Sequence, residues 1–311
     1  MRAFIFPGQG SQAIGMGHAL NAASPAARAV FQEVDEALGQ HLSKLMFEGP
    51  ADELILTANA QPAIMANAIA TLRVLEKEGG IRLADKADYV AGHSLGEYTA
   101  LCAAGAFDLA TTARLLRLRG EVMQAAVPVG VGAMAALLGA DLATAREIAD
   151  AAAEGEVCTV ANDNDPSQVV ISGAKAAIDR AIAIAKDYGA KRAIALPVSA
   201  PFHCPMMQPA ADAMAEALRE ARIDAPLVPV FANVTASPVS DPDTIRQKLV
   251  EQVTGMVRWR ESVLAMSEAG VDCFVEFGGK VLAPMVKRTA PDVDAISVIS
   301  MEDIEALAKS L

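Results

Sequence analysis

Two periods of hydrophobic and polar residues alternate along the chain and predict a mixed α/β protein. Short apolar runs bounded by glycine, proline or polar residues indicate buried strands, whereas longer stretches with apolar residues three or four positions apart indicate helices. Outside the middle of the chain the two kinds of segment follow one another in turn, which is typical of a mostly parallel sheet with helices on both faces. The strands expected there are 2–6, a run ending at 90–91, 228–233, 273–277 and 296–299, and the helices are 26–38, 58–78, 98–104, 109–126, 206–222, 243–253, 260–269 and 281–289.

The middle of the chain follows a different order. The pattern there gives strand 131–138, helix 141–154, strand 157–161, a polar turn at 162–166, strand 168–172, helix 174–188 and strand 191–196. The order β-α-β-β-α-β is that of a ferredoxin-like unit. We therefore expect residues 1–128 and 198–311 to form one large domain, with residues 129–197 inserted as a subdomain. A cleft between two such domains is a usual place for a ligand.

The segment from Asp88 to Tyr98 carries the clearest chemical motif. An apolar run leads into the turn Gly92-His93-Ser94-Leu95-Gly96, and a helix follows. Strand, sharp turn and helix in this order form a nucleophile elbow, which exposes one serine hydroxyl at a helix N-terminus that favours developing negative charge. Glycines flank the serine because its strained backbone leaves no room for Cβ atoms on either side. The motif predicts Ser94 as a nucleophile on a hydrolase-like sheet.

Composition narrows the class of protein. With 311 residues, 53% of them hydrophobic and 21% charged, the chain is long and apolar enough for a globular core. Its four cysteines are scattered without metal-ligand spacing, and no secretion signal is visible, so we expect a cytoplasmic protein without a structural metal. The net charge of −12 opposes binding to nucleic acid or to an anionic membrane, which leaves small molecules or proteins as partners.

The glycine-rich loop after the first strand offers a rival hypothesis. Residues 8–13 fit the dinucleotide fingerprint G-x-G-x-x-A. Residues 14–17 are poor helix formers, however, and the acidic residues Glu33 and Asp35 lie in a helical stretch instead of at the end of a second strand. A glycine-rich loop at the carboxyl end of a strand can equally present backbone N–H groups to an oxyanion, and this is the role we prefer for Gln9.

One arginine lies on the apolar side of its helix. In helix 109–126 the neighbours of Arg119 three and four positions away are leucine, valine and methionine, so its side chain should face the core. A guanidinium keeps its proton and is costly to bury unpaired, so it needs an anion. A salt bridge with an Asp or Glu of the protein is one partner. A substrate carboxylate is the other, because this helix directly follows the elbow helix.

Four histidines are available as a general base. His18 and His41 lie in polar helical stretches, which is typical of surface residues, and His93 lies beside the nucleophile but faces the other way. His203 remains, in the stiff proline-rich loop 197–205 that returns the chain to the large domain. It is either the base or a buried structural histidine.

These motifs together resemble the malonyl-CoA:acyl carrier protein transacylases, and the similarity extends over the whole chain. The segments that carry it are Phe6 to Gln12, Gly92 to Tyr98, Arg119-Gly120 with Met123-Gln124, Phe202-His203, and Glu251-Gln252 before Val257-Arg258-Trp259. The resemblance implies that malonyl-CoA acylates a serine and that the phosphopantetheine thiol of acyl carrier protein then takes the malonyl group. Two thioesters of nearly equal energy are exchanged, so no cofactor is required.

The resemblance also implies roles for the site residues. Ser94 is the nucleophile and His203 its general base and later acid. The N–H groups of Gln9 and Leu95 form the oxyanion hole, and the backbone carbonyl of Gln252 orients the imidazole of His203.

Substrate binding is implied for Arg119, Gln9 and His93. Arg119 holds the free malonyl carboxylate with two hydrogen bonds, which selects malonyl over acetyl.

Docking of an acidic carrier protein needs a local basic patch on this acidic chain. The candidates are Lys191, Arg192, Lys287 and Arg288, for which ordinary solvated charges are an equal alternative. We expect a monomer. Three other functions stay open: a serine thioesterase or esterase with the same elbow, an acyltransferase of polyketide synthesis, and a noncatalytic scaffold whose serine is a relic.

Overall fold

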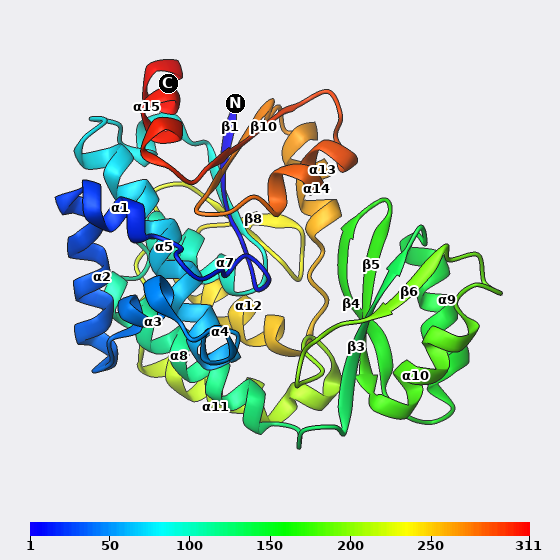
Figure 1. Cartoon of the computed structure of the whole chain (residues 1–311). Coiled ribbons are helices and arrows are strands. Elements are labelled where there is room, and N and C mark those ends of the chain that lie inside the picture. Colours follow the sequence, from blue (N-terminus) through cyan, green and yellow to red (C-terminus); the bar gives the residue numbers. More distant parts are fainter.

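The computed structural model describes residues 1–311 and contains two separate sheets (Figure 1). The larger sheet has six strands in the order β10-β9-β1-β2-β7-β8, and all neighbours are parallel except β7 and β8. Its strands are β1 (Arg2–Phe6), β2 (Tyr89–Gly92), β7 (Val230–Ala232), β8 (Ser237–Val239), β9 (Cys273–Phe277) and β10 (Asp294–Val298). The predicted mostly parallel sheet is confirmed.

Helices cover both faces of this sheet, because both faces of its central strand are apolar. Phe4 and Phe6 of β1 join the main core, whereas Ala3 and Ile5 join a second cluster around Trp259 on the opposite face. The helices are α1 (His18–Ala23), α2 (Pro25–Leu38), α3 (Leu42–Glu48), α4 (Ala51–Leu54), α5 (Thr57–Lys77), α6 (Leu83–Lys86), α7 (Leu95–Ala103), α8 (Leu109–Ala125), α11 (Gln208–Glu220), α12 (Pro242–Thr254), α13 (Trp259–Glu268), α14 (Leu282–Thr289) and α15 (Met301–Ser310), with a short 3₁₀ helix η1 (Pro205–Met207). None of them is both long and apolar enough to cross a membrane.

The smaller sheet is antiparallel and has the strand order β4-β5-β3-β6. It consists of β3 (Gly132–Leu138), β4 (Cys158–Asp165), β5 (Gln168–Ala174) and β6 (Arg192–Ala195), with α9 (Leu142–Ala153) and α10 (Lys175–Ile184). The two helices enclose a core of their own with one face of the sheet, and Figure 1 shows this green unit beside the larger body. The ferredoxin-like insertion is therefore confirmed, and residues 129–197 remain our proposed limits for the subdomain.

One expected turn is wrong. Residues 162–165 belong to β4 and are buried, and the chain turns only at Pro166-Ser167. The backbone of β4 is irregular there, with register shifts after Val160 and Asp163, and it pairs with Val257 of the large domain. Polar residues that would normally favour a solvated turn are held inside because partners from α13 and α14 satisfy them.

Other differences are smaller. The helix after the elbow begins at Leu95 instead of 98, since the turn leads directly into it. The sequence pattern also gave no prediction for β8, the short helices α1, α3, α4 and α6, or the C-terminal α15, which packs against α5.

Candidate active site

The elbow between β2 and α7 holds Ser94 in a conformation that few side chains adopt, with φ 55° and ψ −113°. The flanking glycines are required by space. A Cβ on Gly92 would lie 1.8 Å from the carbonyl oxygen of Gly96, and one on Gly96 would lie 2.2 Å from the carbonyl oxygen of Phe6. The strand, turn and helix therefore pack so closely that only glycine fits on either side of the serine.

Asn233 braces this strained turn. Its Oδ1 accepts a hydrogen bond from the Ser94 N–H at 2.8 Å, and its Nδ2 donates to the Gly92 carbonyl at 2.7 Å. The residue is 1% exposed and directly follows β7, the neighbour of β2 in the sheet. A single side chain thus bonds the backbone on both sides of the elbow, which offsets part of the strain at Ser94.

His203 lies against the nucleophile. Its Nε2 is 2.7 Å from the Ser94 Oγ, and its Nδ1 is 2.9 Å from the carbonyl oxygen of Gln252 and 3.2 Å from that of Gly255. Carbonyl oxygens only accept, so Nδ1 carries the proton and Nε2 is free to accept one from the serine hydroxyl. Burial and the positive charge of Arg119 lower the pKa of His203 to about 3. The imidazole is therefore neutral at physiological pH and ready to act as a base.

Arg119 on α8 is 1% exposed and also reaches the nucleophile. It donates to the side-chain oxygens of Gln61 at 2.8 Å, Gln252 at 2.9 Å and Ser94 at 3.2 Å, and its Nε has no partner. Burial lowers its pKa, although Tyr98 and Glu97 act in the opposite direction. None of its hydrogen bonds goes to a carboxylate, so of the two partners considered for Arg119 the salt bridge within the protein is absent.

A close helix contact places this arginine. A Cβ on Gly120 would lie 2.5 Å from the Cα of Ala58, so α8 approaches the start of α5 more closely than any larger residue would allow. Gln61, one of the partners of Arg119, lies on the same part of α5. The glycine after Arg119 therefore brings the guanidinium and its amide partner together.

The two expected oxyanion donors line the same cavity as the serine. Leu95 is the first residue of α7 and Gln9 lies in the loop after β1, and both residues line the cavity beside Ser94. Neither backbone N–H donates to another group of the protein. The side chain of Gln9 is held by a 3.1 Å hydrogen bond from the Thr57 hydroxyl. Both N–H groups are thus available to an oxyanion.

His93 lines the cavity, and its imidazole bonds the subdomain and not the nucleophile. Its Nε2 donates to the Oδ1 of Asn164 at 2.7 Å, and the Nδ2 of Asn164 donates in turn to Gln168. Burial lowers the pKa of His93. The elbow residue is thereby tied to β4 of the subdomain.

The cavity has a volume of about 250 Å³ and lies between the large domain and the subdomain. Met134, Leu196 and Val198 contribute apolar walls from the subdomain and the segment after it, and Phe202 contributes from the loop that carries His203. Asn162 of β4 also faces it. An acyl chain with a polar end fits such a lining, because the wall combines apolar side chains with polar ones that include Gln61, Arg119 and His203.

The four candidate docking residues lie outside the cavity lining. Lys191 and Arg192 are exposed at the start of β6. Lys287 donates to two backbone carbonyls after α14, and Arg288 pairs with the buried Asp165 at 2.8 Å. The last two therefore already have structural partners.

Five polar residues of the site were not found from the sequence: Gln61, Glu97, Asn162, Asn164 and Asn233. Only Asn233 had a usable signal, since it follows a strand of the parallel sheet at the carboxyl edge where ligands bind. The others lie within helices or at the mispredicted turn. Their roles depend on contacts between segments far apart in the sequence.

Known proteins share this architecture. The family model described as acyl transferase domain matches residues 3–301. A relative from Bacillus subtilis (strain 168), named malonyl CoA-acyl carrier protein transacylase, is 46% identical over 311 residues, which cover 99% of this chain and 96% of the relative. The crystal structure of an acyl-carrier-protein-S-malonyltransferase from Bartonella henselae is 53% identical, with a TM-score of 0.97 and coverage of 99% of this chain and 98% of its own.

A further solved structure contains a carrier protein. It is a type II polyketide synthase acyl-carrier protein in complex with its malonyl-transacylase, and it matches with a TM-score of 0.96 at 39% identity, covering 100% of this chain and 99% of its own. Matches of this length and identity, on a site that brings serine, histidine and a buried arginine together, establish the relationship. The chain belongs to the acyltransferase family that includes the malonyl CoA-acyl carrier protein transacylases.

Proposed function

We propose that this enzyme transfers a malonyl group from malonyl-CoA to the phosphopantetheine thiol of an acyl carrier protein, through a malonyl ester on Ser94. The observation that supports it most is the position of Arg119. Its guanidinium is buried, lies 3.2 Å from the nucleophile and bonds only uncharged acceptors. A carboxylated acyl group on Ser94 would supply the missing negative charge.

The chemistry follows from the geometry. The Ser94 hydroxyl gives its proton to Nε2 of His203 while its oxygen attacks the thioester carbonyl. The N–H groups of Gln9 and Leu95 stabilise the oxyanion that forms. When the C–S bond breaks, His203 returns the proton to the sulfur of CoA. The same steps in reverse, with the carrier thiol as the nucleophile, release Ser94.

Gln252 orients the base in place of a carboxylate. Its backbone carbonyl oxygen accepts a hydrogen bond from Nδ1 of His203. This bond fixes the tautomer of the imidazole without placing a negative charge beside the ring. In a serine hydrolase this position is usually an Asp or Glu. A neutral partner leaves His203 a weaker base, which suits an exchange between two thioesters of nearly equal energy.

Intact-protein mass spectrometry tests the proposal. Incubation with malonyl-CoA should add about 86 Da, the mass expected for a malonyl group, and Ser94→Ala should remove the adduct. Free CoA is then followed with and without carrier protein. Release that stops after one equivalent until carrier is added supports transfer. Continued release without carrier would show a hydrolase, and no adduct at all would show a noncatalytic protein.

The acceptor is proposed to be an acyl carrier protein of fatty acid synthesis; the name of the Bacillus subtilis relative gives an acyl carrier protein as the acceptor of that enzyme. The polyketide complex among the similar structures keeps a polyketide carrier as the alternative. Parallel assays with one carrier of each kind would separate them by kcat/KM. For docking we propose Lys191 and Arg192, the exposed pair, in preference to Lys287 and Arg288.

The enzyme is further proposed to work as a cytoplasmic monomer. Its four cysteines are all free thiols and three are buried, as suits a reducing compartment. Light scattering of the purified protein would test the monomer.

A further inference from the structure

A buried carboxylate next to the site has no part in the steps above. Glu97 lies in the first turn of α7 and is 2% exposed. Its Oε2 accepts hydrogen bonds from the Asn233 N–H at 3.1 Å and from Nε2 of Gln252 at 2.7 Å. It makes no hydrogen bond to the Ser94 hydroxyl or to His203. Burying a carboxylate is costly, so its position calls for an explanation.

The amide of Gln252 has acceptors on one side and a cation on the other. Its Nε2 lies near three acceptors: Oε2 of Glu97 at 2.7 Å, the carbonyl of Ser94 at 3.0 Å and Oδ1 of Asn233 at 3.2 Å. Its Oε1 accepts from Nη2 of Arg119 at 2.9 Å. Glu97 is the nearest of the three acceptors and the only charged one.

This arrangement fixes which way the amide points. The oxygen and nitrogen of an amide have nearly the same size, so a flipped Gln252 would fit the same space. The flip would set Oε1 against the carboxylate of Glu97 and the N–H groups against the guanidinium of Arg119. Both contacts would then be repulsive. The carboxylate on one side therefore ensures that an acceptor faces the arginine on the other.

Gln252 also links the two halves of the site. Its backbone carbonyl accepts from His203, and its side chain accepts from Arg119.

Burial raises the pKa of Glu97 to about 7, whereas the bonds from Asn233 and Gln252 and the charge of Arg119 lower it. Above neutral pH the group is ionised and acts only as an acceptor.

We propose that Glu97 is a positioning residue for acyl-group selection, which acts through the amide of Gln252 to hold Arg119 where it meets a carboxylate on the Ser94-bound acyl group. The inference rests on the proposed malonyl transfer. Glu97 touches no substrate. Its loss should therefore harm the acyl group that needs Arg119 and spare the one that does not.

The test compares Glu97→Met and Glu97→Gln in the full-length enzyme at pH 8. Methionine keeps the volume but accepts no N–H bond, so kcat/KM for malonyl-CoA should fall about tenfold, mainly through KM, while acetyl transfer changes far less. Glutamine should restore most of the malonyl preference, because its carbonyl oxygen accepts the same two bonds. Should the methionine variant not fold, Glu97→Asp withdraws the acceptor by one methylene but keeps the charge, and we expect a smaller loss of malonyl preference.

A matched control is Glu276→Met. Glu276 is equally buried, but its carboxylate accepts from the N–H groups of Val281, Leu282 and Ala283 at the start of α14. This control should lower the melting temperature and leave the malonyl-to-acetyl ratio unchanged.

Four results would overturn the inference. Equal losses for malonyl and acetyl transfer in Glu97→Met would mean that the carboxylate only supports the fold. An unchanged ratio in Glu97→Asp, or no recovery in Glu97→Gln, would mean that the acceptor bond to Gln252 is irrelevant. If the wild-type enzyme itself forms no malonyl adduct, the proposed function fails and this inference fails with it.

Discussion

Buried charge is treated in opposite ways at the active site and at the contact between the two domains. At the domain contact, the fully buried Asp163 and Asp165 of β4 pair directly with Arg260 of α13 at 2.9 Å and Arg288 of α14 at 2.8 Å. At the active site, Arg119 is more deeply buried than either arginine, yet it bonds only amide and hydroxyl oxygens.

The difference supports our proposal that Arg119 is the arginine that binds a ligand. The fold can bring a carboxylate to an arginine where the contact is structural, and it does so twice along β4. Around Arg119 it supplies hydrogen bonds but keeps Glu97 one amide away. Such a guanidinium is held by neutral dipoles, but its charge is not neutralised. It favours an incoming anion, because the guanidinium is already desolvated in the folded protein.

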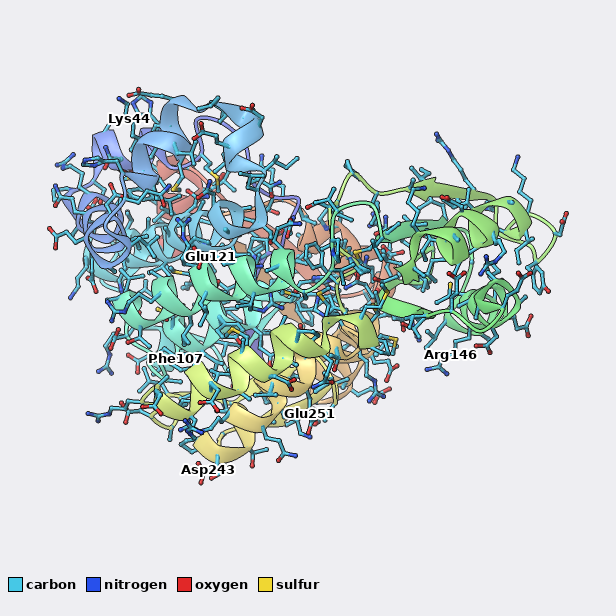
Figure 2. All side chains as sticks on the ribbon, turned by 90° about the horizontal axis from the view of Figure 1, so that it is seen from below. Lys44, Phe107, Glu121, Arg146, Asp243 and Glu251 are labelled. Atoms are coloured by element: carbon cyan, nitrogen blue, oxygen red, sulfur yellow. The ribbon has the colours of Figure 1, made fainter.

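The same stretch of β4 serves both regions. Asp163 and Asp165 pair with helices of the large domain, whereas Asn162 lines the cavity and Asn164 accepts from His93. Alternate residues of a strand point to opposite sides, so one segment both joins the domains and completes the site. Figure 2, which views the molecule from below, shows the subdomain with Arg146 beside the large domain, where Glu251 marks α12.

The largest expected loss of activity comes from removing the nucleophile or its base. Ser94→Ala and His203→Ala should each lower malonyl transfer by roughly 10⁴-fold or more, because the two act as one unit. Steady-state transfer from malonyl-CoA to carrier protein measures this. The double variant should be no slower than either single one. A double variant that loses about the product of both effects would contradict a shared proton transfer.

The second largest effect is expected from removing Arg119, the buried cation without a carboxylate partner. Arg119→Ala should lower kcat/KM for malonyl-CoA by about 3 kcal/mol, or about 150-fold, since a charge-assisted bidentate contact is lost, and should spare acetyl transfer. Arg119→Lys should recover only part of the loss, because an ammonium lacks the planar fork. Equal losses for both acyl groups would make Arg119 a structural residue like Arg260.

Breaking the ion pair between Asp163 and Arg260 should lower the stability of the fold and leave the acyl-group selectivity unchanged. Arg260→Met leaves the carboxylate of Asp163 buried and unpaired, so the free energy of unfolding should fall by about 2–3 kcal/mol. Urea denaturation measures it, and Asp163→Asn added to Arg260→Met should restore part of the loss. The malonyl-to-acetyl ratio of kcat/KM can be expressed as a free energy. If Arg260→Met changed that free energy more than it changed the free energy of unfolding, the division between the two regions would be contradicted.

A pH dependence of stability should come from His203. Its pKa is lowered to about 3 in the folded protein, by burial first and by Arg119 second, so the folded state favours the neutral ring. That stability is present above the unfolded pKa of about 6.5 and is lost as the pH falls toward 3. Glu97, with a pKa raised to about 7, acts in the opposite direction, so the comparison must be made between wild type and His203→Ala.

The expected change in stability with pH is modest. From pH 7 to pH 5 the stability of wild type relative to His203→Ala should fall by about 1–2 kcal/mol. Chemical denaturation of both proteins at the two pH values measures it. A difference that does not change with pH would mean that His203 titrates normally, and thus that neither Arg119 nor burial acts on it.

The smallest expected effect is on docking. Reversing Lys191 and Arg192 to Glu should raise KM for carrier protein several-fold and leave KM for malonyl-CoA unchanged. Lys44→Glu with Lys309→Glu is the matched control, since both lysines are exposed on the large domain and the change in net charge is the same. Equal effects of the two double variants would reduce the result to net charge alone.

Local patterns were enough for the fold and for two of the three reactive groups. The elbow around Ser94 and the inward position of Arg119 follow from spacing within one segment. His203 was reached by excluding the other three histidines, and its role came from the family resemblance. The supporting contacts do not follow from such spacing. Glu97 and Asn233 become part of the site because α7, β7 and α12 meet there. The position of Asn233 after a strand is a local signal, whereas nothing in the segment of Glu97 indicates its contacts.

The error at residues 162–166 has the same cause. Alternating Asn and Asp before a proline favour a turn when their side chains are solvated. Arg260 and Arg288, about a hundred residues later in the chain, pair with the two aspartates, and the strand continues. Tertiary contacts therefore overrode the local preference of this segment.

The central claim is that Arg119 lacks a carboxylate because the malonyl group brings one. A crystal structure of the wild-type enzyme after reaction with malonyl-CoA, without carrier protein, tests it most directly. The account predicts a malonyl ester on Ser94 whose free carboxylate accepts from both Nη atoms of Arg119, with the carbonyl oxygen facing the N–H groups of Gln9 and Leu95. A malonyl ester whose carboxylate points to solvent, with Arg119 still bound only to Gln61 and Gln252, would contradict it.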